Sequence, residues 1–431
     1  MNDHVDILEG VTGSSPWRFQ PPASTVLLAP VSAPSAPTLE SVLQPLADFT
    51  GQDLDVQGAE PPHDDMQWFV GCTIEGLPEP IAVWCEPAGE LQAHYDSVVG
   101  TGYEWTVVIQ THLSPQDPLT HYINLVRLIA CSMQDAPAIL DPQSGHWLER
   151  DLIDTAFLSD RQEPQEDVLW RIDVIESEGN AATGNWIRTV GLDRCGRTEL
   201  ECIGVPPDRT PHAIELLSSL AALSLELSLP ESGVPLDIGP ALRIQLIDAH
   251  TGTEAIEDDQ PGSTHSRAML DDPDVLSAIV VGPNGGGLLY PEAALAALDG
   301  GDVAVYKTER RTRQESMLAQ DTWPILLAAC TSLMEREDEF ECLVQVPFEQ
   351  MGQDEAVREH LWLSIVGIND DIADAVLIHA PRAVQGIEPG WATTVSSDEI
   401  SNWILNGPHG QATPMNTAAL HPLLPDVSES S

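Results

Sequence analysis

Runs in which apolar and polar residues alternate recur along this chain, and runs with apolar residues three or four positions apart lie between them. Alternation with a period of two occurs at 68–74, 81–85 and 105–109, and helical spacing occurs at 39–49 and 122–133. The first pattern is typical of half-buried strands and the second of amphipathic helices. An α+β fold is therefore predicted, with small, mostly antiparallel sheets and helices packed on one face. Because 431 residues exceed what one hydrophobic core organises, two to three domains are expected.

Local signals locate several helices. Thr38 is the expected N-cap of the first helix, and Pro45 inside that helix predicts a kink or an early stop. A long helix is predicted from about residue 314 to 335, with a kink at Pro324, and a short one at 398–405. Strands are predicted between these helices.

A change of composition at 251–275 suggests a boundary between two halves. This stretch combines acidic residues with Pro261 and Gly262, which is typical of a linker. Strands are expected before it at 242–247 and after it at 277–282 and 303–306. The expected segments are an acidic α+β domain (1–160), a second α+β segment (161–250), an acidic linker (251–275), a C-terminal α+β region (276–415) and a tail (416–431).

The chain carries a net charge of −50, from 68 acidic and 18 basic residues, and Lys307 is its one lysine. Such a charge gives no electrostatic attraction to phosphate backbones or anionic membranes, so neither nucleic acid nor membrane is an expected partner. The hydrophobic fraction of 42% is too high for a disordered acidic chain. The acidic side chains are therefore expected on folded surfaces, and they leave open whether a saline habitat or composition bias explains them.

The cysteine pattern and the N-terminal residues predict a cytoplasmic protein. The seven cysteines are an odd set without a C-x-x-C pair, which fits neither a disulfide framework nor structural zinc. Residues 1–10 lack the features of a secretory signal, and 214–229 is too short and too charged to span a membrane. No cofactor motif occurs, and the sequence does not indicate an oligomeric state.

Two parts of the chain resemble uncharacterised bacterial families. The run Glu359–His360–Leu361–Trp362 between two strands, the Gly390 turn and Ile400–Trp403 resemble DUF 2314, over about 338–410. Asn402 stands where that family tends to have aspartate. An upstream group resembles DUF 4026, and its residues are Gly191, Leu192, Gly196, Glu199 and Glu201. Neither resemblance implies a known activity.

Glu359 and His360 are the leading catalytic candidates, because a carboxylate and an imidazole can share acid and base roles. Adjacent residues of a strand point to opposite faces, so His360 would need a distant partner such as His379 or Asp398. The alternative is that His360 supports the sheet and Glu359 is solvated.

A basic cluster is the candidate for binding an anion or an acidic partner. It consists of Lys307, Arg310, Arg311 and Arg313. The alternative is that these residues neutralise nearby carboxylates. The glycine-rich run 282–287 follows a predicted strand, but its spacing is not that of a phosphate-binding loop, and a turn is expected there.

No metal site is expected. His63, Asp64 and Asp65, and separately His94 and Asp96, lack the spacing of zinc ligands and are typical of exposed acidic loops. Cys195 lies between Arg194 and Arg197, which act to lower its pKa, but burial as a packing residue in a turn between strands is the expected role.

Three functions fit these observations. The leading hypothesis is a non-enzymatic protein-interaction module with strongly acidic surfaces. The second is an enzyme of unknown class that uses His360 with nearby carboxylates. The third is an acidic mimic of nucleic acid that binds a basic protein.

Overall fold

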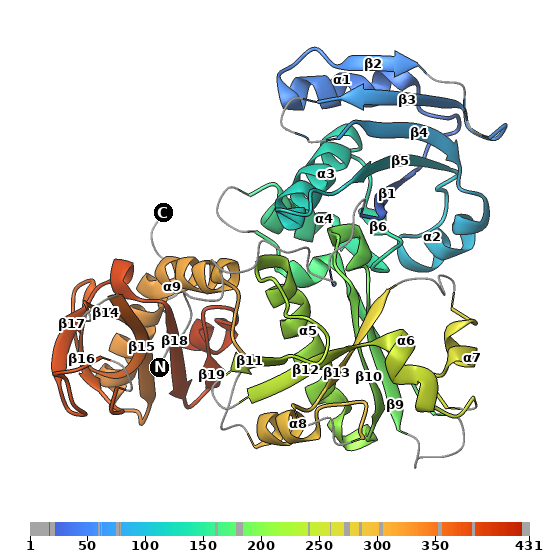
Figure 1. Cartoon of the computed structure of the whole chain (residues 1–431). Helices are drawn as coiled ribbons and strands as arrows, with labels where there is room; N and C mark the ends of the chain where they lie inside the picture. The colour runs from blue at the N-terminus through green and yellow to red at the C-terminus, as the bar shows by residue number, and fades with distance from the viewer. Residues whose placement is uncertain are drawn as a thin grey trace, which may run out of the picture. The chain divides into compact units, whose positions relative to one another are not determined.

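The computed structural model describes residues 17, 22–58, 61, 63–74, 77, 79–159, 163–177, 184–239, 242–258, 260–270, 276–283, 287–300, 305–351, 356–381 and 384–424. They form two compact units that divide between Lys307 and Thr308. The N-terminal unit contains two sheets and the C-terminal unit contains one (Figure 1). Helices accompany all three mostly antiparallel sheets, which confirms the α+β class. In the part of the chain that is described, no helix is long and apolar enough to cross a membrane.

The first sheet has seven strands in the order β2-β3-β4-β5-β1-β6-β7, and each neighbouring pair is antiparallel. The strands are β1 (Ser24–Val31), β2 (Asp55–Gly58), β3 (Trp68–Thr73), β4 (Ile81–Pro87), β5 (Trp105–His112), β6 (Ala138–Asp141) and β7 (His146–Glu149). The helices are α1 (Leu39–Thr50), α2 (Gln92–Val98), α3 (Pro118–Ser132) and α4 (Arg150–Leu152). Helices α1 and α3 share the main core with one sheet face, and α2 meets the other face through the buried Tyr95.

Helix α1 begins where its capping residue predicts. The Oγ1 of Thr38 accepts a hydrogen bond from the N–H of Ser41, which satisfies one of the free donors of the first turn. The early stop that Pro45 predicts does not occur, because the helix continues to Thr50 and ends at Gly51 in the left-handed region.

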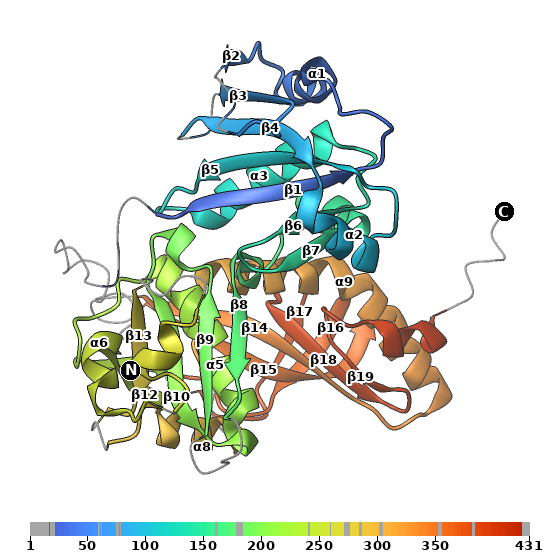
Figure 2. The same ribbon diagram turned by 90° about the vertical axis from the view of Figure 1, so that its right-hand side faces the viewer.

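The second sheet of the N-terminal unit has six strands in the order β11-β12-β13-β10-β9-β8, and β10 with β13 is its one parallel pair. The strands are β8 (Arg171–Ile175), β9 (Asn185–Val190), β10 (Glu199–Val205), β11 (Pro235–Gly239), β12 (Leu242–Asp248) and β13 (Ser277–Val281). The helices are α5 (Thr210–Glu226), α6 (Ala249–Gly252), α7 (Thr264–Arg267) and α8 (Glu292–Asp299). Figure 2 shows β8 at the edge of this sheet and β7 at the edge of the first.

The stretch 251–275, expected as a linker between halves, lies inside the N-terminal unit. It connects β12 to β13, which are neighbours in one sheet, and it contains α7. Arg267 of α7 forms an ion pair with the buried Glu201 of β10, with 2.7 Å between Nη2 and Oε2. This segment is therefore attached to the sheet, and the compact units divide later, at Lys307.

The C-terminal unit is a six-stranded antiparallel sheet in the order β17-β16-β15-β14-β18-β19, packed against the long helix α9 (Glu309–Arg336). The strands are β14 (Glu341–Met351), β15 (Ala356–Asn369), β16 (Ile372–Leu377), β17 (Ala392–Val395), β18 (Asn402–Gly407) and β19 (Gly410–Ala412). Trp323, Cys330 and Leu333 of α9 are buried against the sheet. The helix continues through Pro324 without interruption.

The prediction of a short helix at 398–405 is wrong. Only Ser397–Glu399 forms a helical turn, and the chain then enters the strand β18. Trp403 and Leu405 are buried on one face while Ile404 is half-buried, which is the period of a strand. A short apolar run does not distinguish helix from strand by itself. Of the strand expected at 303–306, residues 303 and 304 lie outside the described residues, and Val305 and Tyr306 are not in a strand.

Candidate functional site

Glu359 and His360 are neighbours on β15, and their side chains contact different parts of the C-terminal unit. Oε2 of Glu359 accepts a hydrogen bond from the N–H of Val384 at 3.1 Å, and Nδ1 of His360 lies 2.8 Å from Oγ of Ser401. These contacts do not bring the two groups together, as the alternation of strand side chains requires. His360 does not line the cavity described below.

The basic cluster falls on both sides of the division between the units. Lys307 belongs to the N-terminal unit, whereas Arg310, Arg311 and Arg313 lie in the first turns of α9. Nε of Arg311 lies 3.3 Å from Oε1 of Glu315, one turn further along the helix. Part of the charge of the cluster is therefore neutralised by an i,i+4 pair on α9 itself.

Cys195 is a buried packing residue, as expected, and the lowered pKa that its two neighbouring arginines suggest does not occur. Cys195 is fully buried, and this burial raises the pKa of its thiol to about 12, although Arg194 and Arg197 act in the opposite direction. Both arginines donate hydrogen bonds to backbone carbonyl oxygens. The guanidinium of Arg197 donates to the carbonyl oxygens of Ser224, at 2.6 Å, and of Pro115, at 2.9 Å. Cys195 is thus a packing residue in a loop that both arginines stabilise.

Arg194 connects the two sheets of the N-terminal unit. It follows β9 of the second sheet and forms two contacts with Asp141 at the end of β6 in the first, Nη2 to Oδ2 at 2.8 Å and Nη1 to Oδ1 at 3.0 Å. Both side chains are completely buried. Tyr122 donates its O–H to Asp141, and its ring lies under the guanidinium at 5.0 Å. Burial alone would raise the pKa of Asp141, but Arg194 holds that pKa below its ordinary value.

The residues considered as metal ligands do not form a metal site among the described residues. Nε2 of His94 accepts a hydrogen bond from the indole of Trp147 at 3.2 Å, and Asp96 accepts one from Gln92 at 2.9 Å. Among the described residues, no three His, Cys, Asp or Glu side chains form a group suited to a metal ion. The centre of the glycine-rich run, 284–286, lies outside the described residues.

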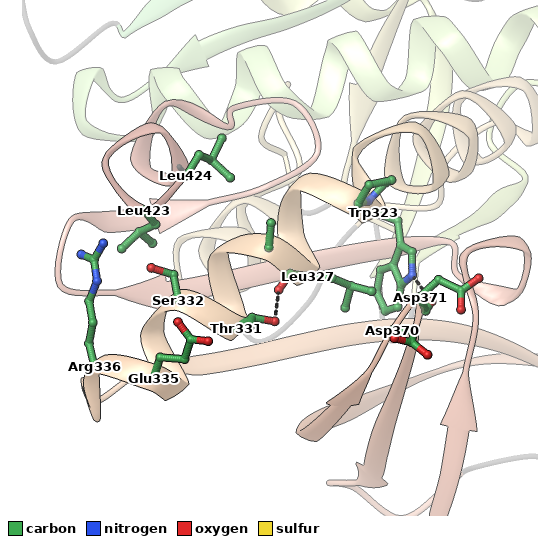
Figure 3. Close-up of a pocket in the computed structure, with 12 residues that line it drawn as sticks. Trp323, Leu327, Thr331, Ser332, Glu335, Arg336, Asp370, Asp371, Leu423 and Leu424 are labelled. Atoms are coloured by element: carbon green, nitrogen blue, oxygen red, sulfur yellow. Dashed lines mark hydrogen bonds between the residues drawn. The ribbon is translucent and has the colours of Figure 1, made fainter. Parts of the chain in front are cut away.

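A cavity of about 630 Å³ lies beside α9 in the C-terminal unit; we call it the α9 cavity (Figure 3). Its volume lies in the range of ligand-binding pockets in proteins. Three segments far apart in the sequence form it: the second half of α9, the β15–β16 turn and residues 423–424. The lining residues are Trp323, Pro324, Leu327, Ala328, Thr331, Ser332, Glu335, Arg336, Asp370, Asp371, Leu423 and Leu424.

The floor of the α9 cavity is apolar, and its rim carries three carboxylates and the guanidinium of Arg336. Trp323, Leu327 and Leu423 are buried by at least 95% and form the floor. Asp370 and Asp371 lie at one end and Glu335 at the other (Figure 3). In the described part of the chain, none of these three carboxylates has an ion-pair partner. The carbonyl end of α9 adds negative partial charge close to Glu335.

Hydrogen bonds hold the walls of the α9 cavity in place. The indole N–H of Trp323 donates to the backbone oxygen of Asp371 at 3.0 Å, which attaches the β15–β16 turn to the helix. Asp370 occupies the left-handed region, with a φ of 56°, which aspartate tolerates better than most residues. The sequence predicts α9 and the position of Pro324 within it. It gives no signal that α9, the β15–β16 turn and residues 423–424 meet.

Two family models match the chain. "Protein of unknown function (DUF4026) C-terminal" matches residues 172–278, and "Uncharacterized protein conserved in bacteria (DUF2314)" matches residues 317–411. Both resemblances noted in the sequence are thereby confirmed. The first match runs through 251–275 and ends in β13, and the second begins inside α9.

A curated protein of Neisseria meningitidis serogroup B, named "Putative ankyrin repeat protein", is similar to part of the chain. The two are 34% identical over 74 residues, which is 16% of this chain and 29% of that protein. The chain therefore spans less than a third of the relative that it matches. No solved structure shows a significant match.

The residues that carry the DUF 4026 resemblance have structural roles. Glu199 is fully buried and accepts hydrogen bonds from the N–H groups of Gly191 and Leu192, at 2.8 and 2.7 Å. Gly191 has a φ of 116°, and a Cβ atom there would lie 2.7 Å from the backbone oxygen of Leu169. These residues form the loop that carries Arg194.

The DUF 2314 match contains most of the α9 cavity. The stretch from Trp323 to Arg336 and the pair Asp370–Asp371 fall within it, whereas Leu423 and Leu424 lie beyond its end. Trp403, in the Asn402–Trp403 pair, is fully buried and donates its indole N–H to Thr322 at 3.0 Å. This pair therefore supports the packing of β18 against α9.

Proposed function

We propose that the protein is a non-enzymatic binding protein whose α9 cavity holds a basic segment of a partner protein. One observation carries the proposal: three carboxylates, which have no ion-pair partner among the described residues, lie at the two ends of an apolar floor, and Arg336 is the one basic side chain that lines the cavity. An apolar side chain of the partner would occupy the floor, and a lysine or arginine beside it would meet the acidic rim. This combination is typical of peptide-binding sites, in which a buried apolar anchor supplies affinity and charge supplies specificity.

Charge favours a cationic partner over an anionic or neutral one. Glu335 is followed by Glu337, Asp338, Glu339 and Glu341, all exposed, with Arg336 as the one basic residue in this run. A concave surface of one sign concentrates the field and speeds the association of oppositely charged molecules. The proposed binding is therefore sensitive to ionic strength.

We place this activity in the cytoplasm. All seven cysteines of the chain are free thiols, and six of them are buried. A reducing compartment preserves such thiols.

The experiment begins with a random dodecapeptide library displayed on phage and selected on the full-length protein. Enriched peptides should combine lysine or arginine with a large apolar residue. The affinity of one enriched synthetic peptide is then measured by fluorescence anisotropy at two salt concentrations. The double variant Asp370→Asn, Asp371→Asn should bind ~3–10-fold more weakly, since each exposed pair contributes up to about 1 kcal/mol. Asparagine also tolerates the left-handed conformation at position 370.

A matched control is available in the N-terminal unit. Asp64 and Asp65 are also adjacent, exposed aspartates, and the variant Asp64→Asn, Asp65→Asn removes the same charge. It should leave the affinity unchanged. Enriched peptides without basic residues, or equal effects of the two double variants, would contradict the proposal.

A further inference from the structure

The α9 cavity has two ends that differ in their chemistry, and the line between them follows α9. Trp323 and Glu335 both line the cavity, so it extends ~18 Å along the helix, since each helical residue advances about 1.5 Å. Figure 3 shows Asp370 and Asp371 at the end where Trp323 lies, and Arg336 at the end where Glu335 lies. We call these the aspartate end and the arginine end.

The aspartate end presents hydrogen-bond acceptors to a ligand. Asp370 and Asp371 are exposed in the turn between β15 and β16, and an ionised carboxylate only accepts hydrogen bonds. Among the described residues that line this end, the side-chain donor is the indole N–H of Trp323, which already donates to the backbone oxygen of Asp371 at 3.0 Å. A group that binds here must therefore donate, and two adjacent negative charges favour a donor that is a cation.

The arginine end presents donors as well as acceptors. Glu335 and Arg336 are both exposed there, and a guanidinium has five N–H donors whereas a carboxylate only accepts. The charges of Glu335 and Arg336 cancel. The carbonyl end of α9 adds a partial charge of about −0.5, which is much less than the two negative charges at the aspartate end. The arginine end therefore attracts a cation less strongly than the aspartate end does.

The wall between the two ends is apolar. Leu327 lies one turn of α9 beyond Trp323, and Leu423, which follows β19 in the chain, also lines the cavity and is 2% exposed. Thr331, one turn further along α9, donates its O–H to the backbone oxygen of Leu327 at 2.8 Å, so this hydroxyl group is used within the helix. The middle of the cavity is therefore suited to an apolar side chain.

We propose that the partner segment lies along α9 in one orientation, with its basic residue at the aspartate end and its apolar residue against Leu327 and Leu423, towards the arginine end. This inference rests on the proposed function and adds which end of the cavity takes the charge. The unequal charges of the two ends select the orientation. In the reverse orientation, the basic side chain lies next to the like charge of Arg336, and both aspartates lack a cationic partner.

The test uses the full-length protein and one enriched peptide with a single basic residue, together with a version in which glutamine replaces that residue. Asp371→Asn and Glu335→Gln each remove one exposed negative charge of the cavity and form a matched pair. Fluorescence anisotropy gives the affinity of each variant for both peptides, which completes a double-mutant cycle. Asp371→Asn should weaken the basic peptide ~2–5-fold more than the glutamine version, whereas Glu335→Gln should change both affinities by the same factor.

A benzophenone side chain placed next to the basic residue of the peptide locates that residue directly. After irradiation, mass spectrometry should find it attached to 319–327 or 368–374, at the aspartate end. Attachment to 331–339 instead, or stronger coupling of the basic residue to Glu335 than to Asp371, would overturn the orientation while basic peptides still bind. Enriched peptides without basic residues would overturn the proposed function itself, and the orientation with it.

Discussion

The two units of this protein differ in where their charged side chains lie. Among the described residues, the N-terminal unit buries six acidic or basic side chains almost completely, namely Asp141, Glu166, Arg194, Arg197, Glu199 and Glu201. In the described part of the C-terminal unit, the buried polar side chains are the neutral Thr308 and Ser401. Among the described residues, no carboxylate of the C-terminal unit is buried, and three of them, Glu335, Asp370 and Asp371, line the α9 cavity.

This difference separates charges that hold the fold from charges that are available to a partner. A buried ion pair fixes the geometry of its elements, but removing one partner leaves an isolated charge in the interior. An exposed carboxylate contributes little to stability and can change partners freely. The same overall acidity therefore has a structural part in one unit and a proposed binding part in the other.

The largest expected effect comes from breaking the pair between the two sheets. Arg194→Met leaves Asp141 buried and unpaired, which should lower the free energy of unfolding of the N-terminal unit by ~3–5 kcal/mol. Urea denaturation followed by circular dichroism measures this change. Arg336→Met, at the exposed end of α9, is the control and should cost less than about 0.5 kcal/mol. A loss below about 1 kcal/mol for Arg194→Met would mean that the pair does not hold the sheets.

A smaller loss of stability is expected in the C-terminal unit when a buried apolar side chain is truncated. Leu363 is fully buried at the centre of β15, and Leu363→Ala should cost ~2–4 kcal/mol through lost burial and a cavity. The loss should be confined to the C-terminal unit. Hydrogen exchange of the strands of the two units distinguishes this outcome from a general destabilisation. Equal loss of protection in β5 and β14 would show that the units do not unfold separately.

Helix capping should contribute equally to the free energy of unfolding of the two units. Thr38 caps α1 and Thr308 caps α9, each through a side-chain oxygen that accepts an N–H three residues later. Thr38→Ala and Thr308→Ala should each cost about 1 kcal/mol, while replacement by serine should cost much less. Thermal denaturation of the four variants measures this. A markedly larger loss at Thr308 would indicate that its burial, rather than capping, determines its effect.

The sequence predicted elements whose signals are local. Alternation located β3, β4 and β5, and Thr38 located the start of α1. It did not predict β1, because the central strand Ser24–Val31 is buried on both faces and its side chains do not alternate in polarity. Periodicity carries no signal for such a strand.

The candidate sites depended on contacts between distant residues. The Arg194–Asp141 pair joins positions 53 residues apart, and the α9 cavity requires residues near 323, 370 and 423 to meet. Neither follows from spacing along the chain. For Glu359 and His360, the strand period correctly implied different neighbours. For Cys195, adjacent arginines suggested a low pKa, and burial reversed it.

The most direct test of the structural role of the buried charge is the pH dependence of one stability difference. Asp141 has a lowered pKa in the folded protein, so its contribution is present above its unfolded pKa of about 3.9 and is lost as pH falls through the folded value. The double variant Arg194→Met, Asp141→Leu removes this contribution. Effects of other groups, such as Glu199, whose pKa burial raises, cancel in the difference.

The free energy of unfolding of the N-terminal unit is therefore measured for the wild type and this double variant between pH 7 and pH 3. The difference should be constant from pH 7 to about pH 5 and should shift in favour of the double variant as pH falls below about 4. Parallel curves over the whole range would contradict the claim that the Asp141–Arg194 pair stabilises the N-terminal unit as an ion pair.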